Sequence, residues 1–401
     1  MSIAVESQLE KPLNKWMITG SYYFSFLILG STQAIIGTTL TGLQTQTAVT
    51  MDMISLIFPL RSVGYMVGAL LGGRLFDRFR GNVVFLFALA LLALGVAAMP
   101  FTTLFYALCA ICLIIGLAEG VVDVGGNTLL VWLHGSKVGP YLNGLHLSWG
   151  IGGLVIPQVV ALSISNGSTY TPSYLAIALI TIPLILVLLR LANPSAPVSH
   201  AEQENKNVSW LIMVVIVVFF GFHVGAESSF GNWITTYALK YFNLGSQPQT
   251  AYNMASLYWF AFTMGRVLAI PFASRIKPGV FLLVDLVGSL LGALVLLAFP
   301  GNLSMAWVGT AMVGLFIASL FPMTIAFAER KMVISAKVTS MFFLGSTSGA
   351  MFFPWVIGQY FEKSSPQIMV IIVMACIVGA IIMYALLELM TRKKAGLKAE
   401  S

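Results

Sequence analysis

Long apolar runs follow one another along almost the whole chain, and short polar segments separate them. A transmembrane α-helix needs about 20 consecutive apolar residues, and most of the runs reach or exceed that length. Unbroken runs indicate helices, since the strands of membrane barrels alternate apolar and polar positions. The pattern predicts twelve helical spans, at residues 17–42, 51–75, 82–99, 102–132, 139–164, 173–192, 209–240, 250–275, 278–298, 303–329, 335–361 and 366–390.

One connector differs from the other loops in length and composition. Residues 193–208 contain the Pro, Ser and charged side chains that are typical of a solvated linker. We expect this linker to separate two bundles of six helices, residues 1–192 and residues 209–401. The expected fold class is therefore an all-α membrane protein with twelve transmembrane helices in a 6+6 arrangement.

The two expected bundles carry related sequence segments. The second and eighth spans end in the similar stretches GALLGGRLFDRFRG and GRVLAIPFASRIKP, which pair Arg78 with Arg275. The fifth and eleventh spans pair Pro157 with Pro354, and both pairs are 197 residues apart. A shared offset at two places favours a duplicated six-helix unit. Transporters built from such repeats hold their substrate near the membrane midplane, between the repeats.

Composition and charge agree with a membrane protein. Hydrophobic residues make up 58% of the 401 residues and charged residues 9%, whereas a soluble domain carries about 25% charged residues. The net charge of +7 follows from topology, because 17 of the 21 Lys and Arg residues fall on one side if both termini are cytoplasmic. Only Lys240 and Lys363 fall on the opposite side. We therefore expect cytoplasmic termini, a cytoplasmic linker and no nucleic-acid partner.

Sequence motifs of common catalytic sites are missing. No GxxxxGK[ST] stretch could form an ATP-binding P-loop, and no Cys/His set has zinc spacing. We expect a protein that is not an enzyme and has no cofactor or metal, with sodium or a proton as the candidate coupling ion.

Three polar residues interrupt the fourth apolar run. Glu119, Asp123 and Asn127 are four residues apart, which places them within about 80° of one helix face. A charge at the bilayer centre costs about 2.5–3.5 kcal/mol on insertion scales, so such residues normally face a cavity or a partner. We expect Asp123 and Asn127 to engage substrate hydroxyl groups, as carboxylates and amides can. An interhelical hydrogen bond is the structural alternative.

Charged residues elsewhere in the spans are candidates for ion pairs. Glu119 is expected either to titrate or to neutralise Arg61. Arg266 is expected to pair with Glu227 or Asp285, in a structural or gating role. A buried pair need not add net stability, although the loss of one partner leaves a costly charge.

The fifth span carries a second group of candidate substrate contacts. Asn143, His146 and Trp149 recur every three residues, so they share one side of a helix. They could form a polar wall beside an aromatic platform, which is a common arrangement in ligand pockets. Helix packing around a hydrogen-bonded histidine is the alternative.

The seventh span carries the counterpart of these groups in the second half. Glu227, Asn232 and Trp233 are candidate substrate contacts, although Glu227 and Trp233 do not share a helix face cleanly. Gly225 and Gly231 could break this helix and let backbone carbonyl groups participate in binding.

The end of the second span resembles a family motif. The loop signature of the major facilitator superfamily reads G-x-x-x-D-R-x-G-R, and Gly73, Asp77 and Arg78 match it, with a small departure in the last three positions. A weaker copy ends at Arg275 and has Ser274 in place of the acid. With the twelve spans and the 6+6 repeat, the resemblance covers essentially the whole chain. It implies that these motif residues hold the two halves together at the cytoplasmic surface during alternating access.

Three shorter segments resemble sugar transporters of this superfamily. DVGGN at 123–127 is similar to the fourth-span signature of the fucose:proton symporter family. Residues 142–146 resemble the opening of the fifth span in the sodium-dependent glucose-transporter-like proteins, and residues 225–233 resemble the seventh span of both groups. Fucose-type proton symporters carry an acid in the first span, where this chain has Gln33, which we include among the expected substrate contacts.

The residues and the resemblance together predict a transporter of a small neutral sugar or polyol, with sodium or protons as candidate coupling ions. A proton-driven exporter of hydrophobic or cationic drugs is the alternative, since Glu119, Asp123 and Glu227 would attract cations. A receptor or scaffold would be expected to carry large soluble loops. We expect a monomer in the lipid bilayer of a bacterial inner membrane.

Overall fold

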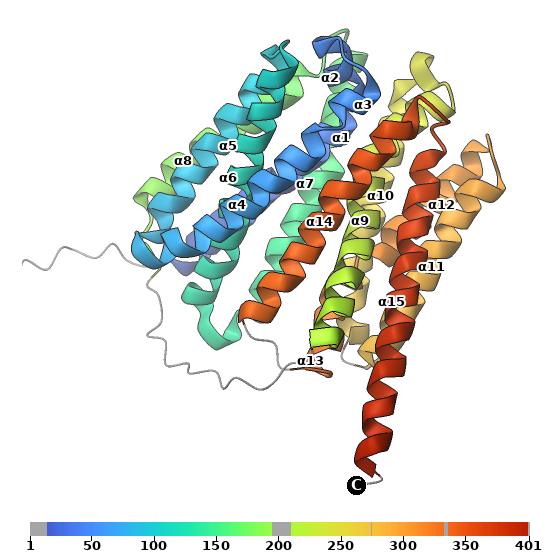
Figure 1. The fold of residues 1–401 in the computed structure, drawn as a ribbon. Helices are drawn as coiled ribbons and strands as arrows, with labels where there is room; N and C mark the ends of the chain where they lie inside the picture. Colours follow the sequence, from blue (N-terminus) through green and yellow to red (C-terminus); the bar gives the residue numbers. More distant parts are fainter. Residues whose placement is uncertain (1–13, 195–209, 274, 333–335, 400–401) are drawn as a thin grey trace, which may run out of the picture.

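The computed structural model describes residues 14–194, 210–273, 275–332 and 336–399, and every regular element in these ranges is a helix (Figure 1). The first half contains α1 (Lys15–Thr38), α2 (Leu40–Thr47), α3 (Met51–Ile54), α4 (Ile57–Arg78), α5 (Gly81–Ala98), η1 (Met99–Phe101), α6 (Phe105–His134), η2 (Gly135–Lys137), α7 (Gly139–Ser165) and α8 (Thr171–Arg190). The second half contains α9 (Trp210–Tyr241), η3 (Leu244–Ser246), α10 (Pro248–Ala273), α11 (Pro278–Ala298), α12 (Leu303–Ile317), α13 (Leu320–Glu329), α14 (Ala336–Phe361) and α15 (Ile368–Ala399).

The predicted twelve-span, all-α fold is confirmed, with a bend in the first span. In the described ranges, 11 helices are long and apolar enough to cross a membrane, and α1 with α2 forms a twelfth span bent by 60°. The hydroxyl groups of Thr38 and Thr39 donate to the carbonyls of Ala34 and Ile35, at 2.7 and 2.8 Å. Such bonds to the preceding turn bend helices, and here they occur at the bend.

A second break divides the span predicted at 303–329. α12 ends before Ala318, and α13 begins after Ser319. The carbonyl of Ala318 has no donor four residues later, because Pro322 has no N–H group. Proline at this position therefore accounts for a break that hydropathy alone does not reveal.

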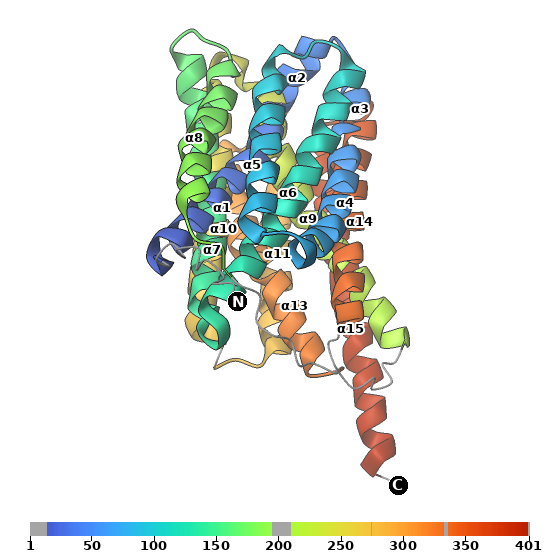
Figure 2. The same ribbon diagram turned by 90° about the vertical axis from the view of Figure 1, so that its left-hand side faces the viewer.

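The two halves meet through corresponding helices. α7 packs against α10, α14 packs against α4, and α1 packs against α9. In the predicted repeat, α7 corresponds to α14 and α4 corresponds to α10, so the first two contacts are related by an approximate two-fold axis. Figure 1 shows α14 lying beside α4, and Figure 2 shows the first half from the side. The contact between the halves is therefore formed by α1, α3, α4, α7, α9, α10 and α14.

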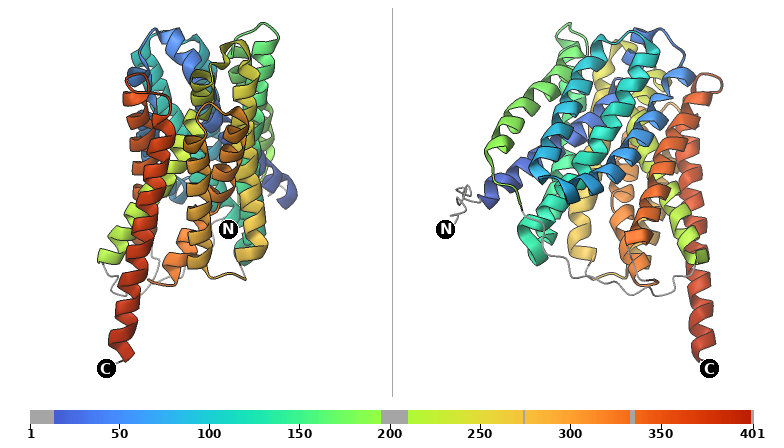
Figure 3. Two further views of the ribbon diagram at one scale, coloured as in Figure 1. Left: turned by 90° about the vertical axis from the view of Figure 1, so that its right-hand side faces the viewer. Right: turned by 60° about the vertical axis from the view of Figure 1, so that its left-hand side comes forward.

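The helix ends define two opposite faces of the molecule. The terminal face is the side where α1 begins and α15 ends, and α15 projects beyond the other helices there (Figure 3). The far face is the opposite side. Exposed apolar side chains such as Phe87, Leu94, Leu179 and Leu389 cover the outside of α5, α8 and α15, as expected for contact with lipid. The predicted linker at 193–208 lies almost entirely outside the described residues, so the domain boundaries stay a prediction.

Candidate substrate site between the two halves

Two helices of the first half bring their backbones into contact. A Cβ atom at Gly116 would collide with the carbonyl oxygen of Arg61, and one at Gly120 with that of Tyr65. Both contacts have the same sequence separation, so α4 and α6 run parallel with a constant register. Side chains one turn apart on α4 therefore meet side chains one turn apart on α6.

The first pair in this register is an ion pair. The Nε and Nη2 atoms of Arg61 donate to the two carboxylate oxygens of Glu119, at 2.8 and 2.6 Å. The side chain of Glu119 is 4% exposed and that of Arg61 is 11% exposed. The predicted pairing is confirmed, and the bidentate geometry neutralises both charges inside the first half.

The second pair lies one turn nearer the terminal face. The phenol of Tyr65 donates to Oδ2 of Asp123. The Nδ2 atom of Asn127 donates to Oδ1 of Asp123 at 3.1 Å and to its backbone carbonyl at 2.9 Å. Asp123 and Asn127 both remain partly exposed. The interhelical hydrogen bond considered for Asp123 is therefore present, and the residue also keeps an accessible surface.

Tyr65 is a residue that the sequence interpretation missed. Its spacing from Arg61 equals the spacing of Asp123 from Glu119, and this equality was the available signal. The signal becomes readable only when α4 is known to run parallel to α6.

Trp149 connects the first half to the second. Its indole Nε1 donates to Oε1 of Gln33 at 3.2 Å, and the side chain is buried. Its ring packs edge-on against Trp259, with centroids 5.2 Å apart, and lies 5.7 Å from the ring of Phe262. Trp149 therefore forms an aromatic platform together with rings of the second half, and its contact with a substrate stays a prediction.

The other two candidates of the fifth span lie closer to the terminal face. His146 is half-buried, and its ring packs edge-on against Phe26 at a centroid distance of 5.9 Å. Asn143 is exposed near the start of α7. His146 thus lies one turn from the aromatic platform, while Asn143 lies further from it along the helix.

The guanidinium of Arg266 packs against this platform. Its Cζ atom lies 4.6 Å from the ring centroid of Phe262 and 5.2 Å from that of Trp149. Arg266 therefore packs against an aromatic ring from each half.

The predicted ion pair of Arg266 with Glu227 or Asp285 is wrong for this structure. Among the described residues, Arg266 has no carboxylate oxygen within ion-pair distance, and its Nε atom donates to the carbonyl of Ala318 at 3.3 Å. Asp285 instead accepts a hydrogen bond of 2.6 Å from the hydroxyl of Ser319. The broken span supplies a backbone acceptor that a pairing of charges by sequence could not anticipate.

The seventh span is an unbroken helix. α9 runs continuously from Trp210 to Tyr241, so the break expected at Gly225 and Gly231 is wrong, and α12–α13 is the interrupted span of this half. Glycine lowers helix propensity without removing a hydrogen bond, and packing keeps α9 intact.

The polar candidates of α9 lie at different depths of the structure. Glu227 is half-buried, and the phenol of Tyr258 donates to its backbone carbonyl at 3.2 Å. Asn232 is also half-buried, and its Nδ2 donates to the carbonyl of Ser228 at 2.8 Å. A Cβ atom at Gly37 would meet the backbone of Asn232, so α1 crosses α9 at this point.

Trp233 lies away from these partly exposed groups. Its side chain is fully buried, and its indole Nε1 donates to the carbonyl of Pro354 at 3.0 Å. The rings of Phe58 and Phe361 lie 5.9 and 4.8 Å away. The structure therefore places Trp233 in the packed contact between the halves and not with Arg266 and Trp149.

The motif residues of the predicted gate lie on the terminal face. Gly73, Asp77, Arg78 and Arg275 are all exposed. In the described part of the chain, none of the three charged residues takes part in an ion pair. The described cross-half hydrogen bonds lie towards the other end of the helices.

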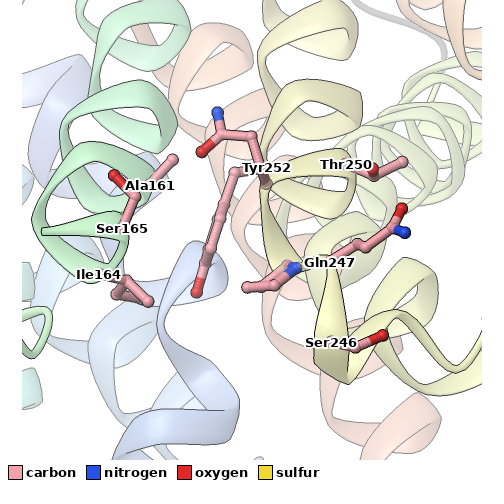
Figure 4. A pocket seen from close by; sticks show the side chains of 9 residues that line it. Ala161, Ile164, Ser165, Ser246, Gln247, Thr250 and Tyr252 are labelled. Atoms are coloured by element: carbon pink, nitrogen blue, oxygen red, sulfur yellow. The ribbon is translucent and has the colours of Figure 1, made fainter. Parts of the chain in front are cut away.

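One seam at the far face joins α7 to α10 through uncharged side chains. The Nε2 atom of Gln158 donates to Oδ1 of Asn253 at 3.0 Å and to the hydroxyl of Ser256 at 2.9 Å. Gln249 donates to the side-chain oxygens of both Gln158 and Asn253. A cavity of about 370 Å³ opens beside this seam (Figure 4), lined by Ala161, Ile164, Ser165, Ser246, Gln247, Pro248, Gln249, Thr250 and Tyr252.

The second seam joins the end of α14 to α3 and the turn that follows it. Gln359 donates to the carbonyl of Asp52 at 3.0 Å and to the hydroxyl of Ser55 at 3.3 Å. Lys363 lies 3.6 Å from the carboxylate of Asp52, and Glu362 accepts from Gln44 at 3.1 Å. Both two-fold-related seams are therefore closed at the far face.

These features define a multi-pass membrane protein with two pseudo-symmetric six-helix halves and a polar group between them. The family model of the Major Facilitator Superfamily matches residues 22–354, and the chain belongs to that superfamily.

Several named relatives are similar to most of the chain. The chain is 28% identical to a protein named sodium-dependent glucose transporter 1 from Danio rerio, covering 86% of this chain and 64% of that protein. It is 27% identical to the protein of the same name from Homo sapiens, covering 83% of this chain and 71% of that one. The chain thus spans a little under two thirds of the first of these relatives.

Solved structures show the same fold. The nucleoside transporter NupG superposes with a TM-score of 0.73 at 17% identity, covering 94% of this chain and 99% of that one. A D-xylose-proton symporter superposes with a TM-score of 0.72 at 13% identity, covering 91% and 97%. A bacterial homologue of the lysosomal transporter Spinster, in an inward-facing and occupied conformation, also has a TM-score of 0.72 at 13% identity, covering 95% and 97%.

Proposed function

We propose that the protein transports a small neutral sugar or polyol across the membrane by alternating access. The observation that carries this proposal is the group of partly exposed polar side chains between the halves, beside the Trp149 platform. Asp123 and Asn127 come from the first half, and Glu227 and Arg266 come from the second. Such groups can accept and donate hydrogen bonds to several hydroxyl groups at once, while an aromatic face covers the apolar side of a sugar ring. The names of the relatives support the same substrate class.

We propose that the structure represents the state open toward the terminal face. Both seams at the far face are closed, and the gate residues Asp77, Arg78 and Arg275 are exposed and lack ion pairs among the described residues. Alternating access would then open the Gln158 and Gln359 seams and bring the gate residues of the two halves together. Rocking of one repeat against the other around a fixed site is the usual means.

We propose that both termini are cytoplasmic and that the protein works as a monomer in a bacterial inner membrane. The distribution of Lys and Arg residues supports this orientation, since 17 of 21 fall on the side of the termini. In this orientation the terminal face is cytoplasmic and the far face is external.

We also propose that transport is coupled to a cation, either sodium or a proton. Asp123 and Glu227 are the carboxylates that would carry it, because Glu119 is already neutralised by Arg61. The first span supplies Gln33 and no acid. Alkalinisation of a lightly buffered medium during substrate uptake would identify the proton, and a requirement for sodium without alkalinisation would identify sodium.

A ligand screen on the purified protein tests the substrate class directly. Thermal unfolding in detergent is measured with a panel of sugars, polyols and amphipathic cations, each with and without sodium. A ligand at 100 times its dissociation constant stabilises the native state by about 2.7 kcal/mol, which raises the unfolding temperature. We expect stabilisation by a monosaccharide or polyol and not by the amphipathic cations. Stabilisation by the cations alone would reject the proposal in favour of a drug exporter.

A further inference from the structure

The break between α12 and α13 leaves one backbone acceptor free inside the second half. Pro322 cannot donate to the carbonyl of Ala318, which lies four residues earlier. The Nε atom of Arg266 takes the place of the missing donor, at 3.3 Å. In the described part of the chain this is the one hydrogen bond of the guanidinium, and its other contacts are with the rings of Phe262 and Trp149. The carbonyl of Ala318 therefore contributes the hydrogen bond that helps to orient Arg266 over these rings.

A carboxylate on the neighbouring helix holds the same turn from the opposite side. The hydroxyl of Ser319 donates to Oδ2 of Asp285 on α11 at 2.6 Å, and Asp285 is 4% exposed. Ser319 occupies the N-cap position of α13, but its side chain forms no capping bond. The hydroxyl is thus used between helices, where it ties the broken turn to α11.

The two contacts are close enough to act as one unit. Ala318 and Ser319 are consecutive, and a Cβ atom at Gly265 would collide with the carbonyl of Leu315 and with the side chain of Ala318. The backbone of α10 therefore rests directly on the broken turn, beside Arg266. A shift of Ser319 would move the carbonyl of Ala318 and with it the anchor of Arg266.

We propose that Asp285 is a positioning residue for Arg266, acting through Ser319 and the free carbonyl of Ala318. Asp285 does not touch the substrate. By accepting the Ser319 hydrogen bond, it fixes the carbonyl that holds the guanidinium over the rings of Trp149 and Phe262. The consequence for transport rests on the proposed function, because it requires Arg266 to bind substrate.

The variants separate hydrogen bonding from charge. Asp285→Ala removes the acceptor, whereas Asp285→Asn keeps an acceptor oxygen for Ser319 and removes the charge. Pro322→Ala provides a new N–H group for the Ala318 carbonyl, in competition with Arg266, and improves helix propensity at that position. Ser289→Ala is the matched control, since its buried hydroxyl lies one turn from Asp285 and has no hydrogen-bond partner in the described structure.

A ligand-free measurement reports on Arg266 without assuming a substrate. Fluorine NMR of fluorotryptophan-labelled protein follows the resonance of Trp149, assigned by its absence in Trp149→Phe. The guanidinium lies 5.2 Å above this ring, so its displacement changes the shift. We expect the resonance to move in Asp285→Ala and Pro322→Ala and to stay in place in Asp285→Asn and Ser289→Ala. A resonance unchanged in Pro322→Ala, or an Asp285→Asn spectrum like that of Asp285→Ala, would overturn the proposal.

Binding of D-glucose to the same variants tests the consequence for the substrate site. Asp285→Ala and Pro322→Ala should each weaken binding about tenfold, the value of one hydrogen bond to a charged group. In a protein that already carries Arg266→Lys, neither Asp285→Ala nor Pro322→Ala should weaken the binding of D-glucose further. Additive losses would show that Asp285 acts independently of Arg266. If the wild-type protein binds no sugar while the Trp149 resonance behaves as expected, the proposed function fails and the positioning role stands.

Discussion

Tyr65 donates a hydrogen bond to Asp123 across the contact of α4 and α6, one helical turn from the ion pair of Arg61 and Glu119. The two pairs share the same two helices and the same register, yet their chemistry differs. Arg61 gives Glu119 a partner of opposite charge, whereas Tyr65 gives Asp123 an uncharged donor, and part of the Asp123 surface stays accessible. One pair is therefore suited to hold the helices together, and the other to meet a substrate or a cation.

We predict that Tyr65→Phe weakens substrate binding through Asp123. The substitution removes the phenol donor and leaves the ring, so the carboxylate loses one fixed partner and gains freedom to reorient. Loss of a hydrogen bond to a charged group costs about 1.5–3 kcal/mol, or about ten- to a hundredfold in affinity. Equilibrium binding of labelled D-glucose measures the effect.

Tyr22→Phe is the matched control for this prediction. Tyr22 is buried in the same half, and its phenol donates to Asn82 at 2.9 Å, away from the candidate site. It should lower stability and leave binding unchanged. Equal effects of the two substitutions on binding would argue against a role of Tyr65 in the site.

We predict that Arg61 and Glu119 act structurally. Arg61→Met or Glu119→Leu alone should lower the free energy of unfolding by about 3–5 kcal/mol, because each leaves a buried charge without its partner. The double substitution should recover most of that stability and most of the transport activity. Thermal unfolding and uptake of the four proteins measure both effects. A stable double variant without transport would show that the pair has a role in coupling.

We predict that the amide groups at the far face hold this state closed. Gln158→Ala removes hydrogen bonds to Asn253 and Ser256, and Gln359→Ala removes those of the other seam. Each hydrogen bond contributes about 0.5–1.5 kcal/mol, so each substitution should shift the population toward the alternative state by two- to tenfold or more. Electron–electron resonance distances between spin labels across the far face would report the shift.

Gln367→Ala provides the control for this measurement. Gln367 donates to the phenol of Tyr241 at 2.5 Å, so it uses the same amide chemistry within the second half only. Its substitution should leave the distance distribution unchanged. Distributions that are identical in all three variants would mean that other contacts close the far face.

We predict that Asp77→Asn slows transport and leaves the fold intact. Asp77 is exposed and has no ion pair in the described structure, so its substitution should not change the unfolding temperature measurably. If Asp77 contributes to closure of the terminal face, turnover should fall while the dissociation constant of the substrate stays the same. Unchanged turnover would remove Asp77 from the gate.

Much of the fold could be predicted from the sequence. Apolar runs report the bilayer-spanning helices because lipid imposes a single length and composition on them. The 197-residue offset of Pro157 and Pro354 also predicted the correspondence of α7 with α14, which the contacts between the halves reflect. The ion pair of Arg61 with Glu119 followed from the cost of unpaired charges in the membrane.

The remaining features depend on neighbours that hydropathy cannot identify. The sequence suggests a carboxylate partner for Arg266, because the charges are visible in it. The actual acceptor is the carbonyl of Ala318, which lacks a helical donor because of Pro322 and lies on another helix. The sequence also suggests Trp233 as a substrate contact. Its spacing does not reveal that the carbonyl of Pro354 accepts the hydrogen bond of its indole group. In both cases a backbone carbonyl, which has no signature in the sequence, satisfies the polar group.

Counterflow in proteoliposomes tests the central proposal most directly. Vesicles containing the purified protein are preloaded with unlabelled D-glucose, and the entry of labelled D-glucose is followed for the wild-type protein and for Asp123→Asn. Alternating access at a site formed by Asp123 predicts transient accumulation of the label by the wild-type protein, and accumulation reduced at least tenfold in a folded Asp123→Asn variant. Equal accumulation by the two proteins, or none with any monosaccharide or polyol, would contradict the proposal.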